Sequence, residues 1–270
     1  MNDKTKAIFV LLFYLLVLVD SGCSGTSPNS QAVTQNTVEH VKTEANNLSK
    51  IDVVKTEKIV YGYKKGDIFL NKYKSVPSVK QIILVAQSDT EVSHARLYLV
   101  TKNDAGEWIE TLSCQAFLGK NGIDKTREGD IRTPTGDFGM TMAFGAKDDP
   151  GSLIPYTKLT NTMYFCGDKE YYNQFIDISK VKHTCSSNSE HLLSYIPQYN
   201  YALVFDYNKE NVYGKGSAIF LHCLGNHPFT MGCVAVAEEN MIKILNTVDF
   251  NSRICIYSNR PSTAINTNNT

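Results

Sequence analysis

The chain has 270 residues, and its 27 Lys and Arg balance its 27 Asp and Glu, so the formal net charge is zero. No basic excess marks a nucleic-acid footprint, and we expect no nucleic-acid partner. With the polar ends set aside, about 200 residues rich in Tyr, Phe, Ile and Val remain, which is enough for one sizeable domain with a single core.

The first 23 residues have the pattern of an export segment. Lys4 and Lys6 precede an unbroken apolar run over 7–19, which is short for a membrane span and typical of the central region of a signal peptide. Asp20-Ser-Gly-Cys23 then resembles a bacterial lipobox, in which a small residue precedes the lipid-bearing cysteine. We expect export to the cell envelope, and lipidation of Cys23, ordinary cleavage and an uncleaved membrane anchor remain open.

Polar stretches set the expected domain bounds. Residues 24–52 are rich in Ser, Thr, Asn and Gln and poor in large apolar side chains. Such a stretch cannot repay the entropy of folding, so we expect a flexible linker. Residues 259–270 form a second polar tail. The folded domain is therefore predicted over 53–258.

Short β-rich runs separated by Gly, Asn, Asp and Pro predict a mostly β fold, either a sandwich or a barrel. A helix is predicted over 238–248, where apolar residues recur at helical spacing and two glutamates in the first turn suit the helix dipole. A second short helix is expected over 188–196. The predicted strands span 81–87, 94–102, 108–116, 201–207, 217–223, 233–237 and 253–258.

A candidate nucleophile lies where one of these strands opens into a turn. His222 lies near the end of an apolar strand, and Thr230-Met231-Gly232-Cys233 precedes the next strand. A thiol is a modest nucleophile until it is ionised, so an imidazole that takes its proton makes it effective. We predict Cys233 as nucleophile and His222 as base, with His227 as the alternative base. The amides of Met231, Gly232 and Cys233 are predicted to bind the oxyanion, and Thr230 to orient or cap the turn.

Strand alternation argues against a metal at this turn. His222 and Cys223 are adjacent on one strand and must point to opposite faces, and no Cys-x2-Cys spacing is present. We therefore expect no metal site and no cofactor. A thiol oxidoreductase is disfavoured because no Cys-x-x-Cys lies near a βαβ pattern.

The remaining cysteines divide into two groups. Cys166 and Cys185 flank a stretch rich in Tyr and Asn and are the favoured pair for a disulfide. Cys114, Cys223 and Cys255 lie inside apolar runs and are expected to be small buried hydrophobes.

Three motifs together resemble one family. The segment from Gly216 to His222, followed by Thr230-x-Gly-Cys233, resembles the signature of the L,D-transpeptidase (YkuD-like) catalytic domain. Upstream, the segment 129–138 with Thr133-Pro-Thr-Gly136 resembles that family's Thr-Pro-x-Gly turn, and the surroundings of 171–173 and 199–204 resemble a branch common in Gram-positive bacteria. The likeness runs from about residue 82 to residue 257.

The resemblance implies a mostly β fold, a thiol nucleophile and peptidoglycan stem peptides as substrate. Cys233 would attack the carbonyl of the L-residue in an L,D-peptide bond, expel the terminal D-amino acid and form a thioester. An amine acceptor would then give a cross-link, whereas water would make the enzyme an L,D-carboxypeptidase.

Two positions depart from the family pattern: many members have His at Met231 and Arg or Asn at Ala235. These departures keep open a catalytically inactive wall-binding module with the same fold. A long insert over 146–198 is a candidate lid over the site. The candidates for the missing substrate contacts are Arg132, Arg127, Asn226 and Tyr156.

Overall fold

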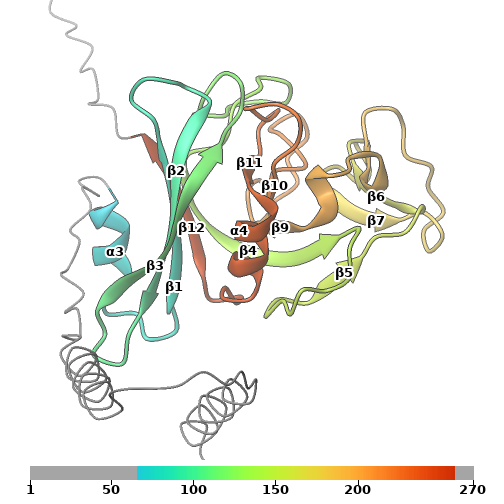
Figure 1. Ribbon diagram of the computed structural model, residues 1–270. Helices are drawn as coiled ribbons and strands as arrows, with labels where there is room; N and C mark the ends of the chain where they lie inside the picture. The colour runs from blue at the N-terminus through green and yellow to red at the C-terminus, as the bar shows by residue number, and fades with distance from the viewer. Residues whose placement is uncertain (1–65, 259–270) are drawn as a thin grey trace, which may run out of the picture. The chain divides into compact units, whose positions relative to one another are not determined.

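The computed structural model describes residues 66–258 (Figure 1). The predicted export segment with Cys23, the linker over 24–52, the tail over 259–270 and the first part of the predicted domain, 53–65, lie outside the described residues. Within 66–258, no helix is both long enough and apolar enough to cross a membrane.

The described chain is mostly β, which confirms the predicted fold class. Its two α-helices are α3 (Asp67–Tyr73) and α4 (Glu238–Leu245), and two short 3-10 turns span Leu192–Ser194 and Gln198–Asn200. The strands are β1 (Gln81–Gln87), β2 (His94–Lys102), β3 (Trp108–Phe117), β4 (Gly136–Gly145), β5 (Tyr156–Lys158), β6 (Met163–Cys166), β7 (Gln174–Asp177), β8 (Glu190–His191), β9 (Ala202–Phe205), β10 (Phe220–Cys223), β11 (Val234–Val236) and β12 (Arg253–Ser258).

Eight of these strands form a closed mixed barrel. Neighbouring strands follow the order β12-β1-β2-β3-β11-β10-β9-β4, and β12 pairs with the first part of β4 to complete the circuit. The pairs β1–β12 and β10–β11 are parallel, and the other pairs in the circuit are antiparallel. β5 adds a short parallel pairing to the far end of β4.

The barrel interior is the main hydrophobic core, and α4 closes it. Met241, Ile244 and Leu245 of α4 are fully buried, as is Val248 just beyond it. They pack against inward-facing strand residues such as Leu221 and Val234. The apolar residues at helical spacing in the sequence therefore form the face of α4 that packs into the barrel.

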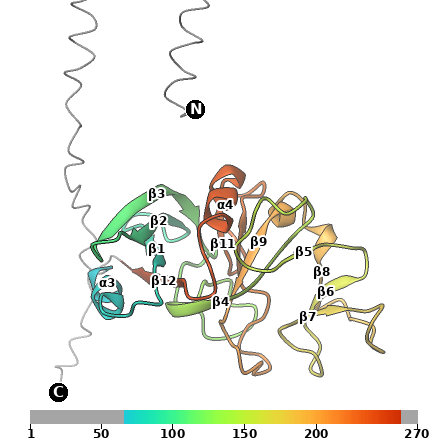
Figure 2. The same ribbon diagram turned by 90° about the horizontal axis from the view of Figure 1, so that it is seen from below.

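The predicted lid insert lies beside the barrel, on the side away from α3 (Figures 1 and 2). It carries β5 and a three-stranded sheet in the order β7-β6-β8. Aromatic side chains of the insert and of the barrel's outer face form a second core. Its members include Phe165 of β6, Phe144 of β4 and Phe220 of β10.

Two local expectations differ from the structure. The helix expected over 188–196 is instead the short strand β8 followed by a 3-10 turn, because β8 pairs with β6 at Phe165–Glu190. The strand β4 was not among the predicted strands. It contains Gly136, Gly139 and Gly145, which lower β-propensity, and at Gly145 an added Cβ would lie only 2.2 Å from the Asn200 carbonyl oxygen.

Candidate active site

The parallel pairing of β10 and β11 brings His222 and Cys233 to one face of the barrel wall. Leu221 pairs with Val234, and His222 pairs with Ala235. Because side chains alternate along strands, His222 and Ala235 face away from the barrel interior, together with Cys233 immediately before β11. There they line one pocket of about 260 Å³ between the barrel and the insert.

The turn before Cys233 depends on Gly232 and on the hydroxyls of Thr230 and Thr133. Gly232 has φ +152°, and an added Cβ would lie 3.0 Å from Ile219 Cδ1 and 3.1 Å from the Arg132 carbonyl oxygen, so a side chain does not fit there. The Thr230 hydroxyl accepts the Gly232 amide proton at 3.1 Å and donates to the Cys233 carbonyl at 2.7 Å. Thr230 therefore caps its own turn.

The Cys233 sulfur is held as a neutral thiol. Its S–H donates to the Ala218 carbonyl at 3.2 Å, and the Phe220 amide donates to the sulfur at 3.3 Å. Burial and the nearby Glu190 carboxyl raise the pKa of the Cys233 thiol to about 12. Ala218 itself has φ +53°, an uncommon conformation for alanine, and this conformation is what turns its carbonyl toward the thiol.

His222 is oriented as a base. Its Nδ1 lies 2.7 Å from the Cys223 carbonyl oxygen, and since a carbonyl can only accept, Nδ1 carries the proton and Nε2 keeps its lone pair. Burial lowers the pKa of His222 to about 4, so the ring is neutral at physiological pH. The ring packs edge-on against Tyr199, with 5.5 Å between the ring centroids. The resting pair is thus a neutral thiol and a neutral imidazole.

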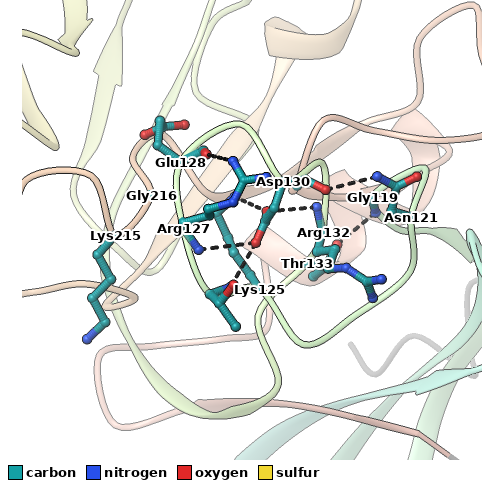
Figure 3. Close-up of polar contacts among 12 residues, drawn as sticks. Gly119, Asn121, Lys125, Arg127, Glu128, Asp130, Arg132, Thr133, Lys215 and Gly216 are labelled. Carbon is teal, nitrogen blue, oxygen red and sulfur yellow. Dashed lines mark hydrogen bonds and ion pairs between the residues drawn. The ribbon is translucent and has the colours of Figure 1, made fainter.

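The loop that carries the Thr-Pro-x-Gly sequence folds around one carboxylate. Asp130 accepts from Lys125 Nζ at 2.8 Å and from the amides of Thr126, Arg127 and Arg132 (Figure 3). Burial raises the pKa of Asp130, but these four donors outweigh it and lower the pKa to about 2. The carboxylate therefore stays ionised and fixes the loop.

This loop reaches the catalytic turn through Thr133. The fully buried Thr133 hydroxyl donates to the Cys233 carbonyl at 3.0 Å and accepts from the Gly119 amide at 2.8 Å. The Cys233 carbonyl is thus held by Thr133 from one side and by Thr230 from the other. The Thr-Pro-x-Gly segment holds the nucleophile's backbone in place.

Comparison with known proteins identifies the domain. A family model for the L,D-transpeptidase catalytic domain (YkuD) matches residues 81–256, more than half of the chain. The chain belongs to this family.

Solved structures and curated proteins add little to this assignment. The crystal structure of L,D-transpeptidase (Yku) from Stackebrandtia nassauensis is similar at 14% identity with a TM-score of 0.31, covering 68% of this chain and 58% of that one. The chain therefore spans less than two thirds of that structure's length. A search of curated proteins found no match. The matched model describes the catalytic domain of L,D-transpeptidases.

The candidates for substrate contacts fall into two groups in this YkuD domain. Asn226 lines the pocket with Cys233. Arg132 and Tyr156 do not line it: an Arg132 guanidinium N–H donates to the Ile123 carbonyl at 2.9 Å, and the Tyr156 hydroxyl donates to the Lys147 carbonyl at 2.9 Å. Both side chains serve local loop structure.

The two positions that depart from the family pattern both border the pocket. Met231 is 68% exposed at its rim, and Ala235 lies buried in its wall. His227 also lines the pocket, and its ring stacks on Phe229 at 5.3 Å between centroids. Of the two pocket histidines, His222 is the one with a hydrogen bond to a backbone carbonyl that sets its tautomer.

Sequence reasoning missed the polar groups that the YkuD domain places around Cys233. Glu190 enters the pocket from the insert and Tyr199 from the 3-10 turn just after it, and the Tyr199 hydroxyl donates to the Glu190 carboxyl at 2.6 Å. Burial raises the pKa of Glu190 to about 7. Lys125, whose side chain is 1% exposed, enters from the Asp130 loop. These residues share no motif with His222 or Cys233, so no sequence signal joins them.

The insert also holds the backbone beside the thiol. The Asn173 side-chain oxygen accepts from the Ala218 amide at 3.2 Å, while its Nδ2 donates to the Asn208 carbonyl at 3.0 Å. The Tyr172 hydroxyl donates to Glu128 and accepts from the Gly216 amide. The Tyr-Asn segment of the insert therefore supports the stretch whose Ala218 carbonyl binds the Cys233 thiol.

Proposed function

We propose that the chain is an exported, cysteine-dependent L,D-transpeptidase that cross-links peptidoglycan stem peptides. The observation that carries the proposal is that Cys233 lines one pocket with a buried, neutral His222 whose Nδ1 proton is bound by the Cys223 carbonyl. This tautomer leaves Nε2 as the proton acceptor for the thiol.

In the proposed first half-reaction, the Cys233 sulfur attacks the carbonyl carbon of the L-residue while its proton passes to His222 Nε2. The tetrahedral intermediate collapses, the bond to the terminal D-amino acid breaks, and His222 returns the proton to the leaving amine. A thioester on Cys233 remains. Because both groups start neutral, proton transfer accompanies the attack, with no preformed ion pair.

The proposed oxyanion site has fewer amide donors than the three that the sequence predicts. The Gly232 amide donates to the Thr230 hydroxyl within the turn. The amides of Met231 and Cys233 are therefore the donors that we assign to the developing negative charge. The two threonine bonds to the Cys233 carbonyl keep this turn rigid, which is what preorganised donors require.

In the second half-reaction, an amine of another stem peptide attacks the thioester carbonyl, and the thiol is released as His222 returns the proton that it takes from the amine. The insert side of the pocket supports an amine acceptor, because Glu128 and Glu190 both line it. Carboxyl groups attract an ammonium ion, and a group with a pKa of about 7 can take its proton. Water as acceptor would make the enzyme an L,D-carboxypeptidase.

The test is acylation of the full chain by a carbapenem, followed by intact-protein and peptide mass spectrometry. We expect one acyl adduct on Cys233, and the Cys233→Ala variant should form none. Cys223→Ala is the matched control, because Cys223 is equally buried but faces the barrel interior, and it should react normally. An adduct at another cysteine would contradict the assignment.

A defined tetrapeptide muropeptide then distinguishes the remaining functions. Products joined through a new amide bond support transpeptidation, and loss of the terminal D-amino acid alone would show a carboxypeptidase. If no product forms while the chain still binds the cell wall, the chain is the catalytically inactive wall-binding module that the departures at Met231 and Ala235 allow. The proposed export and membrane anchoring are tested by cell fractionation and by lipid labelling of the chain against Cys23→Ala.

A further inference from the structure

A cluster of metal-binding side chains lies in the insert, apart from the catalytic pocket. Cys166 ends β6, and His183 and Cys185 lie in the segment between β7 and β8. Their ligand atoms all lie within 4.8 Å of one another. Both cysteines are free thiols, so the disulfide expected between them is absent.

We propose that Cys166, His183, Cys185 and Asp168 bind one zinc ion as a structural site. The Cys166 sulfur lies 3.5 Å from His183 Nε2, and Asp168 Oδ2 lies 3.1 Å from the same nitrogen. In a tetrahedral zinc site, ligand bonds of about 2.3 Å for sulfur and about 2.0 Å for nitrogen or oxygen separate S from N by about 3.6 Å and N from O by about 3.3 Å. The Cys166–His183 and His183–Asp168 pairs are therefore spaced as zinc ligands, and the Cys185 sulfur lies within 4.8 Å of the Cys166 and His183 ligand atoms.

The kinds of donor also favour zinc. Two thiolates, an imidazole and a carboxylate form a mixed soft and borderline set that suits zinc and disfavours calcium or magnesium, which take oxygen ligands. Binding displaces the two thiol protons, and His183 binds as the neutral ring. No oxidant is needed, in contrast to formation of a disulfide.

Polar groups around the proposed ligands contact them and hold them in place. The Ser189 hydroxyl donates to the Cys166 sulfur at 3.6 Å, and the Ser186 amide donates to Asp168 Oδ2 at 2.8 Å. On the far side of the imidazole, Glu170 Oε2 lies 3.8 Å from His183 Nδ1. At hydrogen-bond distance, a carboxylate in this position would fix the tautomer that presents Nε2 to the metal.

The segment that carries two of the ligands has little else to order it. In this described stretch, no apolar side chain between Ile176 and Leu192 belongs to the buried core. A segment without a core of its own gains its order from cross-links or metal ligation. Its far end is β8, which places Glu190 in the catalytic pocket. Zinc would therefore fix the edge of the insert that borders Cys233, at a site separate from the turn where the sequence argues against a metal.

The experiment measures the metal content of the full chain, purified without a chelator, by inductively coupled plasma mass spectrometry. We expect about one zinc ion per chain. Cys185→Ser and His183→Asn should each lower zinc affinity at least tenfold. Cys233→Ala and Cys114→Ala are the matched controls, and both should retain the metal. Loss of zinc in Cys233→Ala with retention in Cys185→Ser would overturn the site in favour of the catalytic turn.

Cobalt gives a second readout that does not depend on a variant. After chelation and reduction, Co²⁺ added to the unaltered chain should produce thiolate charge-transfer absorption and the intense visible bands of a tetrahedral site. A reduced chain that binds neither metal would overturn the proposal, as would isolation with a Cys166–Cys185 disulfide. Carbapenem acylation in the same samples reports the proposed function separately.

Discussion

The proposed catalytic base, His222, is shielded from water, and its imidazole has one hydrogen-bond partner on the backbone. His222 is 6% exposed, and its Nδ1 proton is bound to the Cys223 carbonyl. Desolvation penalises the imidazolium and lowers its pKa to about 4, from an ordinary value of 6.5. The base form therefore persists well into the acid range.

This shift predicts the pH dependence of acylation. The carbapenem acylation rate should hold down to about pH 5 and fall below it, because His222 gains its proton only near pH 4. The measurement is the initial rate by mass spectrometry between about pH 4 and pH 8, with circular dichroism at each pH to confirm folding. An acid limb centred at the ordinary histidine pKa would contradict the buried, neutral base.

Glu190 predicts a change in thiol reactivity. Its carboxyl contributes to the raised pKa of Cys233, so Glu190→Gln should lower that pKa. The variant should react faster with iodoacetamide at neutral pH, where the unaltered carboxyl is partly ionised. Glu239→Gln, at an exposed position on α4, is the control and should react at the normal rate. An unchanged or slower rate for Glu190→Gln would show that the carboxyl does not act on the thiol.

At the scale of elements, the turn before Cys233 is held by a loop from the other half of the domain. Thr133 lies 100 positions before Cys233 and binds its carbonyl directly. Strands β10 and β11 orient the turn, and the Thr133 hydroxyl fixes its backbone. The position of the sulfur therefore depends on the order of the Asp130 loop.

Replacing Thr133 tests this dependence. Thr133→Val keeps the shape of the side chain but leaves the Gly119 amide without an acceptor and the Cys233 carbonyl with one donor fewer, so we expect a loss of about 1–3 kcal/mol in unfolding free energy. The acylation rate should fall about tenfold or more. Thr133→Ser retains the hydroxyl and should restore most of both. The measurements are urea unfolding and acylation kinetics, and a valine variant with normal kinetics would count against the role.

The sequence predicts the elements of this fold unevenly. Strands with alternating or continuous apolar residues, such as β1 and β2, have the predicted bounds, because burial alone specifies them. The glycine-rich strand β4 and the two-residue strand β8 escape prediction, since each is stabilised by distant partners. The helix α4 ends at Leu245, before the predicted Val248, although Val248 is still buried.

The candidate site is predictable only where its residues share a motif. His222, Thr230 and Cys233 lie within twelve positions and on adjoining strands, so spacing and alternation place them together. Glu190 reaches the pocket from the insert, Tyr199 from the turn that follows it, and Lys125 from the Asp130 loop. Their meeting depends on tertiary packing that local spacing does not encode. For the same reason, local sequence allows Arg132 and Tyr156 as substrate contacts, whereas in the structure both side chains donate to backbone carbonyls.

At the scale of the whole molecule, closure of the barrel and docking of α3 converge on Asp137. This residue lies where β4 pairs with β12. It accepts from Lys72 and Tyr73 of α3, both at 2.6 Å, and from Arg253 of β12 at 2.7 Å. Burial raises the pKa of Asp137, but these three donors outweigh it, so the pKa is lowered. One carboxylate therefore joins the first helix to the seam of the barrel.

Asp137→Asn should weaken both connections. We expect a loss of about 1.5–3 kcal/mol in unfolding free energy near neutral pH, typical of hydrogen bonds to a charged group. Because the pKa of Asp137 is lower in the folded chain, its stabilisation is present above the ordinary value of 3.8 and is lost as the pH falls below it. The gap between variant and unaltered protein should thus shrink in acid. Urea unfolding at several pH values measures it, and a gap independent of pH would contradict this account.

The bond from the Cys233 S–H to the Ala218 carbonyl has a consequence for the lifetime of the enzyme. Peroxides and other oxidants attack the thiolate form of cysteine, and they require access to the sulfur. A sulfur that is 7% exposed and stays protonated offers neither. For the exported enzyme that we propose, the Cys233 thiol would therefore stay unoxidised between turnovers and would react only when a substrate lies in the pocket beside His222.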